Sequence, residues 1–165
     1  MSRTPDSSTF GPLLETRVAD AWVDYNGHMN DAEYARVFSL AVEALMERIG
    51  LDVAGRAEHG YTLYTLETHL CYRKEAHRGE ALAVTLLLLD SDSKRLHVLF
   101  TLTNAAGETL ATSEQMLMGI DIESGRPGAF PAPVASALET LPRAGEEWPR
   151  AAGRRLAGDG LRVRA

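Results

Sequence analysis

DAEYARVFSLAVEALMERI, residues 31–49, is the stretch that decides the fold, because its apolar residues recur at spacings of three and four. This is the period of an amphipathic α-helix. Asn30 or Asp31 can serve as its N-cap, and Gly50 stands where a glycine commonly ends a helix. The apolar positions are Tyr34, Val37, Phe38, Ala41, Leu45 and Ile49. One apolar stripe of this length predicts a helix that packs against a sheet.

Strand-like segments lie on both sides of this helix. Leu13–Ala19 precedes it, and four more segments follow a glycine-bearing loop at Asp52–Gly60. The connections are short and therefore favour antiparallel hairpins, so we expect the four segments to form a meander. They are Tyr61–Arg73, Ala81–Leu89, Arg95–Thr103 and Thr109–Asp121. The predicted class is α+β, with an antiparallel sheet of about five strands and one long helix.

Composition bounds the function. The 165 residues suit one folded domain, with 45% hydrophobic and 24% charged side chains. A formal net charge of -6 argues against binding to nucleic acid or to anionic membranes, since such binding usually needs a basic field. The longest apolar run, Ala81–Leu89, is about half of the roughly 20 residues that cross a bilayer. We expect a soluble domain without a nucleic-acid or membrane partner.

The ends of the chain differ from its middle. We predict a flexible N-terminal segment at residues 1–12, the folded domain at 13–122, and a partly disordered extension at 123–165 with one short helix at Val134–Leu141. The N-terminal segment lacks the apolar core of a secretory signal. Cys71 is the only cysteine, which weakly favours a reducing compartment. The expected location is the cytoplasm.

A second signal lies directly before the helix, where DYNGHMN occupies residues 24–30. Free backbone N–H groups and the positive dipole end meet at a helix N-terminus, where they can polarise a carbonyl under attack. A carboxylate just upstream can act on water or on an acyl carbon. Asp24 is the candidate catalytic residue. The alternative is a purely structural turn, because Asp and Asn are common turn formers.

This motif, Asp24-x-x-Gly27-His28-x-Asn30, followed by a long helix and four strands, resembles the 4-hydroxybenzoyl-CoA thioesterase-like hotdog family from about Leu14 to Asp121. The resemblance implies a hotdog fold, in which the sheet wraps around the helix. It implies that Asp24 is a nucleophile or general base, that helix amides near Gly27, His28 and Asn30 bind the thioester oxygen, and that homodimers or homotetramers carry active sites between subunits. No cofactor is implied beyond the coenzyme A of the substrate.

A narrower resemblance is to the betainyl-CoA thioesterases of bacterial carnitine degradation, which are sometimes fused to a dehydrogenase. It rests on WVDYNGHMN at residues 22–30, YTLETHL at 64–70, KRLH at 94–97 and ATSEQML at 111–117. It implies hydrolysis of betainyl-CoA to glycine betaine and CoA. No dehydrogenase domain or dinucleotide fingerprint is present in the sequence.

Candidate substrate-binding residues follow from that substrate, since aromatic faces and carboxylates recognise a trimethylammonium group. The candidates are Trp22, Tyr25, Tyr61, Tyr64, Glu67 and His69. The aromatic residues can equally belong to the core or an interface. Glu67 and His69 share one face of a strand and can satisfy each other as a pair.

Two basic residues at a hairpin end, Lys94 and Arg95, are candidates for the phosphates of CoA, although charged turns are usually only solvated. No metal site is expected, because the histidines and the one cysteine show no ligand spacing such as His-x-x-x-His.

Other functions remain open at this point. Within the same chemistry, the chain can be a broader short-chain or aromatic acyl-CoA thioesterase. In another class, it can be a hotdog enoyl-thioester hydratase or dehydratase, which would release no free thiol. A third class is an acyl-CoA or betaine binding module without turnover.

Overall fold

Helix α1 (Asp31–Arg48) forms where the periodicity predicts it, in a computed structural model that describes residues 10–157. Asn30 is the N-cap, with extended backbone angles, but its side chain makes no capping hydrogen bond. The chain leaves the helix through Gly50, whose φ of 85° lies in the left-handed region that a glycine adopts easily.

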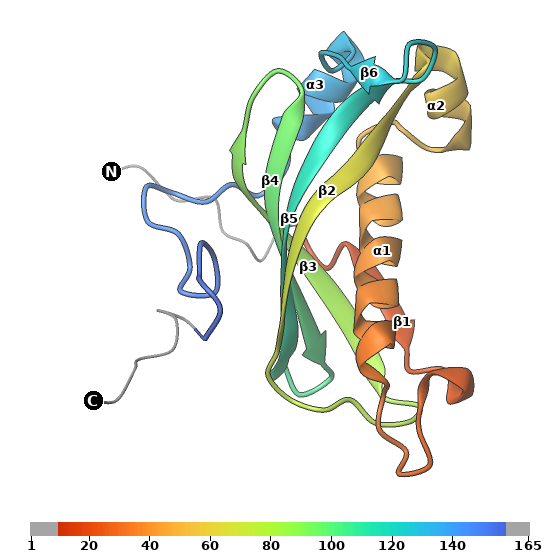
Figure 1. Cartoon of the computed structure of the whole chain (residues 1–165), viewed down its shortest axis with the longest axis vertical. Helices are drawn as coiled ribbons and strands as arrows, with labels where there is room; N and C mark the ends of the chain where they lie inside the picture. The colour runs from red at the N-terminus through yellow and green to blue at the C-terminus, as the bar shows by residue number, and fades with distance from the viewer. Residues whose placement is uncertain (1–9, 158–165) are drawn as a thin grey trace.

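The sheet is antiparallel and confirms the predicted α+β class. Its strands run in the order β1-β3-β4-β5-β2, and the short β6 pairs with β5 (Figure 1). The bounds are β1 Leu14–Arg17, β2 Tyr61–Tyr72, β3 Ala81–Ser91, β4 Arg95–Asn104, β5 Thr109–Asp121 and β6 Arg126–Pro127.

The predicted four-strand meander is wrong at its first step. Strands β3, β4 and β5 are consecutive hairpins, but β2 pairs with β5 and β1 pairs with β3. The link at residues 73–80 does not close a hairpin. It passes beneath the N-terminus of α1, where an isolated β-bridge joins His77 to His28 (Figure 1). As a result β2 is an edge strand, and the link contacts the loop that carries Asp24.

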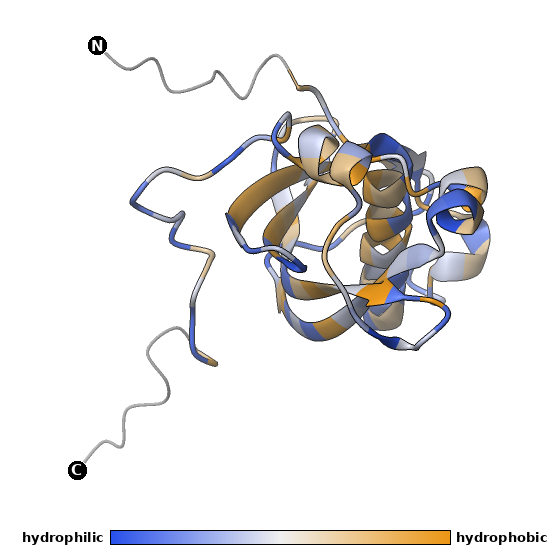
Figure 2. Cartoon of the chain, turned by 90° about the horizontal axis from the view of Figure 1, so that it is seen from above, coloured by the Kyte–Doolittle hydropathy of each residue, from blue (hydrophilic) through white to orange (hydrophobic). Residues whose placement is uncertain are grey.

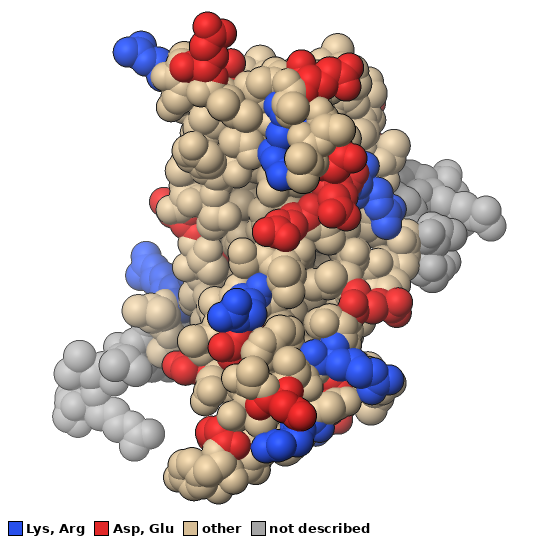
Figure 3. Space-filling view, turned by 90° about the vertical axis from the view of Figure 1, so that its right-hand side faces the viewer, with Lys and Arg blue, Asp and Glu red and all other residues tan. Residues whose placement is uncertain are grey.

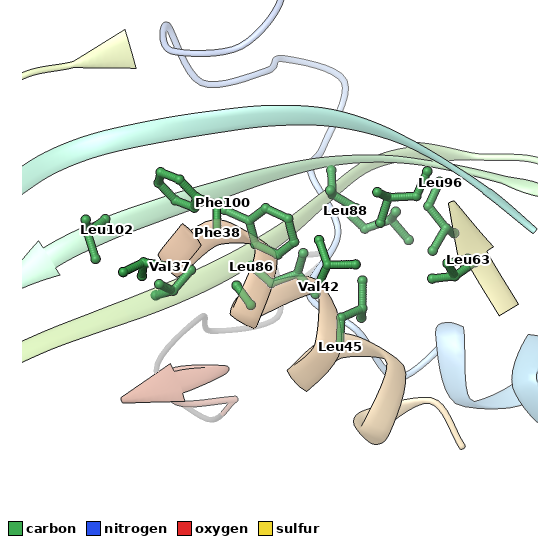
Figure 4. Packing of buried hydrophobic residues seen from close by; sticks show 14 of the residues in the cluster. Val37, Phe38, Val42, Leu45, Leu63, Leu86, Leu88, Leu96, Phe100 and Leu102 are labelled. Atoms are coloured by element: carbon green, nitrogen blue, oxygen red, sulfur yellow. The ribbon is translucent and has the colours of Figure 1, made fainter. Parts of the chain in front are cut away.

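The core lies between α1 and the sheet, which curves around the helix when seen from above (Figure 2). Phe38 of α1 and Phe100 of β4 lie against each other with ring centroids 6.3 Å apart (Figure 4). Val37, Ala41 and Leu45 of the same helix are fully buried. Burial of this stripe is the main force that holds α1 against the sheet, since each Å² of apolar area removed from water stabilises the fold by roughly 25 cal/mol.

The segment Asp52–Gly60, predicted as a loop, contains helix α2 (Val53–His59). The Asp52 side chain caps it by accepting a hydrogen bond from the Gly55 amide at 2.7 Å. Gly60 ends it in a left-handed conformation. Periodicity is weak over so short a helix, and its end signals decide the structure.

The C-terminal extension contains the short helix that the sequence predicts, shifted by two residues toward the N-terminus at its start. Helix α3 (Ala132–Leu138) buries Val134 and Leu138, and Leu141 behind it is also buried. The chain then crosses the face of the sheet opposite to α1, where the Gly153 amide donates to the Glu114 carboxylate. The partial disorder expected for the rest of the extension stays a prediction. Residues 1–9 of the predicted flexible N-terminal segment lie outside the described residues.

Residues 10–157 contain no helix that is both long and apolar enough to cross a membrane. The apolar run Ala81–Leu89 forms most of β3. On the face that carries α1, acidic and basic side chains are interspersed (Figure 3).

Candidate active site

Asp24 sits in a tight turn directly before α1 and is half-buried. Its Oδ1 accepts hydrogen bonds from the amides of Asn26 at 2.8 Å and His28 at 3.2 Å. Its own amide donates to the His28 carbonyl. One carboxylate oxygen is thus held in place, while Oδ2 makes no hydrogen bond within the described residues. A carboxylate with one fixed and one free oxygen suits both a general base and a nucleophile.

The backbone amides expected to polarise the thioester are already engaged. Each of the four amides from Gly27 to Asn30 donates within the chain; the acceptors are, in order, the Asp24 carbonyl at 3.0 Å, the Asp24 carboxylate at 3.2 Å, the Ala76 carbonyl at 2.8 Å and the Trp22 carbonyl at 2.9 Å. Gly27 has a φ of 78°, which this turn requires. In this chain Gly27 and Asn30 therefore shape the Asp24 loop rather than offer free donors.

The first turn of α1 offers one free donor. The Asp31 amide, as the first of the helix, has no intrahelical acceptor and makes no other hydrogen bond among the described residues. The next two amides are taken, by the Asp31 side chain and by the Asn30 carbonyl. The helix dipole reinforces this position for a developing negative charge.

His28 points to the link beneath α1. Its Nδ1 lies 3.2 Å from Oε2 of Glu75, and its ring packs edge-on against His77 with centroids 5.0 Å apart. The supporting partners of His28 come from a segment far away in the sequence, so the sequence predicted the histidine but not its neighbours.

The predicted aromatic group does not assemble within one chain. Tyr61 belongs to the core: it is 3% exposed, its hydroxyl donates to the Gly128 carbonyl at 2.7 Å, and burial raises its pKa to about 12. Tyr64 is exposed on the same half of β2, whereas Trp22 and Tyr25 lie beside Asp24 at the opposite end of the sheet (Figure 1). Tyr61 is thus removed from the substrate-binding candidates.

Glu67 and His69 share one face of β2, as the strand parity predicts, but this face lies away from α1. A β-bulge between Thr65 and Glu67 sets this parity. The two side chains line a cavity of about 320 Å³ together with His97 and Glu114. His69 contacts Cys71, with Nε2 3.5 Å from Sγ, and no hydrogen bond joins it to Glu67 within the described structure.

Lys94 lies in the turn between β3 and β4 and Arg95 begins β4, at the far end of the sheet from Asp24 (Figure 1). The Arg95 guanidinium is paired with Asp92 at 2.7 Å. This pairing, together with backbone amides, lowers the pKa of Asp92 to about 2. Lys94 pairs with no carboxylate in the described residues and is the better candidate for a phosphate.

Residues 18–138 match the family model described as the Thioesterase-like superfamily. The chain belongs to this superfamily. Its relatives include a betainyl-CoA thioesterase of Pseudomonas aeruginosa, 43% identical over 82% of this chain and 86% of that protein. Another is the L-carnitine dehydrogenase/betainyl-CoA thioesterase of Rhizobium meliloti, 41% identical over 85% of this chain. The chain spans 28% of the length of that longer relative.

Solved structures agree with the superfamily and with the predicted hotdog fold. A Staphylococcus aureus protein in complex with CoA is 35% identical, with a TM-score of 0.80 over 86% of this chain and 91% of that one. A Pseudomonas putida protein is 36% identical, with a TM-score of 0.75 over 93% of this chain and 97% of that one.

One buried polar side chain was not predicted from the sequence. Gln115 faces α1 from β5, is 4% exposed and donates to Ser113, yet its Oε1 has no hydrogen-bond partner among the described residues. The side-chain alternation of a strand could have indicated it, because Ser113 and Gln115 lie on the same face of β5 as the core residues Ala111 and Leu117.

Proposed function

We propose that this protein hydrolyses an acyl-CoA thioester and that its substrate is betainyl-CoA, which yields glycine betaine and CoA. The observation that carries the proposal is the Asp24 turn, which holds one carboxylate oxygen and leaves the other free beside the N-terminus of α1. The identity of 43% to a betainyl-CoA thioesterase over 86% of that protein supports the choice of acyl group.

The chemistry needs only this carboxylate and water. As a general base, Asp24 takes a proton from water, the hydroxide adds to the thioester carbonyl, and the C–S bond breaks to release CoA thiolate. As a nucleophile, Asp24 displaces the thiolate itself and forms an anhydride that water then hydrolyses. Either route ends in a carboxylic acid and free CoA. The Asp31 amide is the proposed donor to the carbonyl oxygen.

The functional unit in this proposal is a homodimer or homotetramer. Strand β2 pairs only on its β5 side within the described chain, and residues 64–68 along it are exposed, including Leu66 at 53%. An unpaired edge of this kind is a template for another strand. Antiparallel pairing with β2 of a second copy would place Tyr64 of one chain near the Asp24 end of the other, which a single chain does not achieve.

Leu66→Lys tests this assembly, because charge on an edge strand opposes pairing. The expected result is self-association weakened roughly tenfold or more, with the fold retained, since Leu66 is exposed in the single chain. Light scattering after size exclusion would measure the mass at several concentrations. Leu156→Lys, on a still more exposed residue of the extension, is the control. A wild-type protein that is monomeric at every concentration would contradict the proposed assembly.

Substrate selection is proposed to rest on the cationic headgroup. Trp22 and Tyr25 beside Asp24, with Tyr64 of a second copy, offer aromatic faces, each contributing roughly 0.5–2 kcal/mol to a bound cation. Lys94 of the second copy is the proposed contact for a CoA phosphate.

The sharpest substrate test uses a matched pair. In 3,3-dimethylbutyryl-CoA, carbon replaces the cationic nitrogen of betainyl-CoA, so shape is kept and charge is lost. The expected kcat/KM for betainyl-CoA is about 10-fold to 100-fold higher, as two of the three proposed aromatic faces would already supply. Equal values for the pair would overturn the betaine assignment and leave a broader acyl-CoA thioesterase, while acetyl-CoA and benzoyl-CoA in the same panel would show its range.

The cytoplasm is the proposed location, which follows from the proposed CoA thioester substrate rather than from any feature of the fold.

A further inference from the structure

A cluster of potential metal ligands lies beneath the N-terminus of α1. It consists of His28 from the Asp24 loop and of Glu75 and His77 from the link between β2 and β3. One ligand atom from each side chain lies within 4.8 Å of the other two. Sequence spacing gave no sign of this cluster, because its members come from segments that meet only in the fold.

The backbone holds the two segments together independently of any ion. His28 and His77 form an antiparallel β-bridge. On either side of the bridge, the Met29 amide donates to the Ala76 carbonyl at 2.8 Å, and the Arg78 amide donates to the Gly27 carbonyl at 3.0 Å. The two imidazole rings are therefore fixed as cross-strand neighbours, which lowers the entropic cost of closing a site around an ion.

The distance between two of the candidate ligand atoms suits a tetrahedral ion. Nδ1 of His28 and Oε2 of Glu75 are 3.2 Å apart. Bonds of about 2.0–2.1 Å to a tetrahedral zinc ion separate neighbouring ligands by roughly 3.3 Å. The His77 ring stands at 78° to the His28 ring with centroids 5.0 Å apart, and its ligand atom lies within 4.8 Å of those of His28 and Glu75.

A supporting carboxylate already orients His77. Oε2 of Glu80 accepts the His77 amide at 2.8 Å and lies 3.6 Å from the ring Nδ1. A hydrogen bond from Nδ1 to this carboxylate would leave Nε2 of His77 as the ligand atom, the carboxylate–histidine arrangement that commonly supports a bound metal. All three candidate ligands are partly exposed, so an ion can enter from solvent.

We propose that His28, Glu75 and His77 form a binding site for a divalent transition-metal ion of the zinc class. Two nitrogens and one oxygen match the ligand preference of zinc, and three protein ligands leave a fourth position for water. A bound ion connects the loop that carries Asp24 to the link beneath α1, in addition to the β-bridge that already joins them.

The test uses tag-free protein treated with a chelator and dialysed. Titration with zinc against a chromophoric competitor should show one ion per chain with a Kd on the order of 1 µM or tighter. Glu75→Gln and His77→Ala should each weaken binding roughly tenfold or more, since each removes one of three ligands. His59→Ala, which removes a histidine of α2, should leave the Kd unchanged. At equal zinc concentration, zinc should raise the Tm of the wild type and of His59→Ala by the same amount, and that of His77→Ala by less.

Two results would overturn the proposal. One is the absence of saturable zinc binding at total zinc of about 100 µM, which would leave the cluster as an ion pair between His28 and Glu75. The other is binding that persists unchanged in the Glu75→Gln, His77→Ala double variant. Circular dichroism of each variant identifies any that fails to fold. If a His77 variant does not fold, zinc binding by Glu75→Gln alone tests the proposal.

Discussion

Asp24→Asn should lower kcat for betainyl-CoA roughly 10²-fold to 10⁴-fold, the usual contribution of a positioned acid or base. Asparagine is chosen because its side-chain oxygen can still accept the amides of Asn26 and His28, which shape the turn. The change therefore removes the charge and leaves the loop. Thiol release measures turnover, and an unchanged Tm and oligomeric mass would establish that the variant is folded.

Asp20→Asn is the matched control for this variant. Asp20 lies a few residues earlier and is exposed, and its only ion pair within residues 10–157 is a long contact of 3.9 Å to Arg78. Its loss should change kcat less than about twofold, because exposed ion pairs contribute little. Near-normal turnover in folded Asp24→Asn would instead show that the carboxylate does not drive the reaction.

Gly119→Ala should be the most destabilising single-methyl change in the chain's sheet. A Cβ at Gly119 would stand 1.6 Å from the Tyr61 hydroxyl oxygen and 2.5 Å from Cζ of the same ring. The ring has no room to move, since it is buried and packs edge-on against Phe130. We expect the free energy of unfolding to fall by about 3 kcal/mol or more, from overpacking and loss of the hydrogen bond to Gly128.

Denaturant unfolding of four variants checks this expectation: the two glycine changes, Tyr61→Phe and the double variant. Gly128→Ala is the control, because its added Cβ would meet only Asp121 at an ordinary 3.7 Å and should cost within about 0.5 kcal/mol. Tyr61→Phe combined with Gly119→Ala should cost less than the sum of the two single changes, since the clashing hydroxyl is gone. Equal stability of Gly119→Ala and Gly128→Ala would show that Tyr61 does not fill this space.

Local patterns predicted much of the fold. Helix α1 followed from the period of its apolar residues and from Gly50, and the β3–β4–β5 hairpins followed from short connections. The position of β2 did not follow, because which strand completes a sheet depends on how the whole sheet closes around α1. Helix α2 was missed because seven residues carry too little periodicity to outweigh a glycine in the segment.

The candidate site was likewise predicted only in part from the sequence. The motif singled out Asp24, and its turn is the expected structure for Asp and Asn. The occupied amides from Gly27 to Asn30 were not foreseen, since two of their acceptors, Ala76 and Trp22, lie outside the motif. The candidate aromatic residues form two groups, one near residues 22–30 and one near residues 64–70. The two groups lie at opposite ends of the sheet, because these two segments do.

Release of free CoA thiol from betainyl-CoA by the purified wild-type protein, with Asp24→Asn assayed alongside, tests the central claim most directly. We expect rapid release by the wild type, with glycine betaine formed in equal amount, and almost none by the variant. Absence of thiol release by folded, oligomeric wild-type protein would contradict it and direct attention to enoyl-thioester chemistry or to binding without turnover.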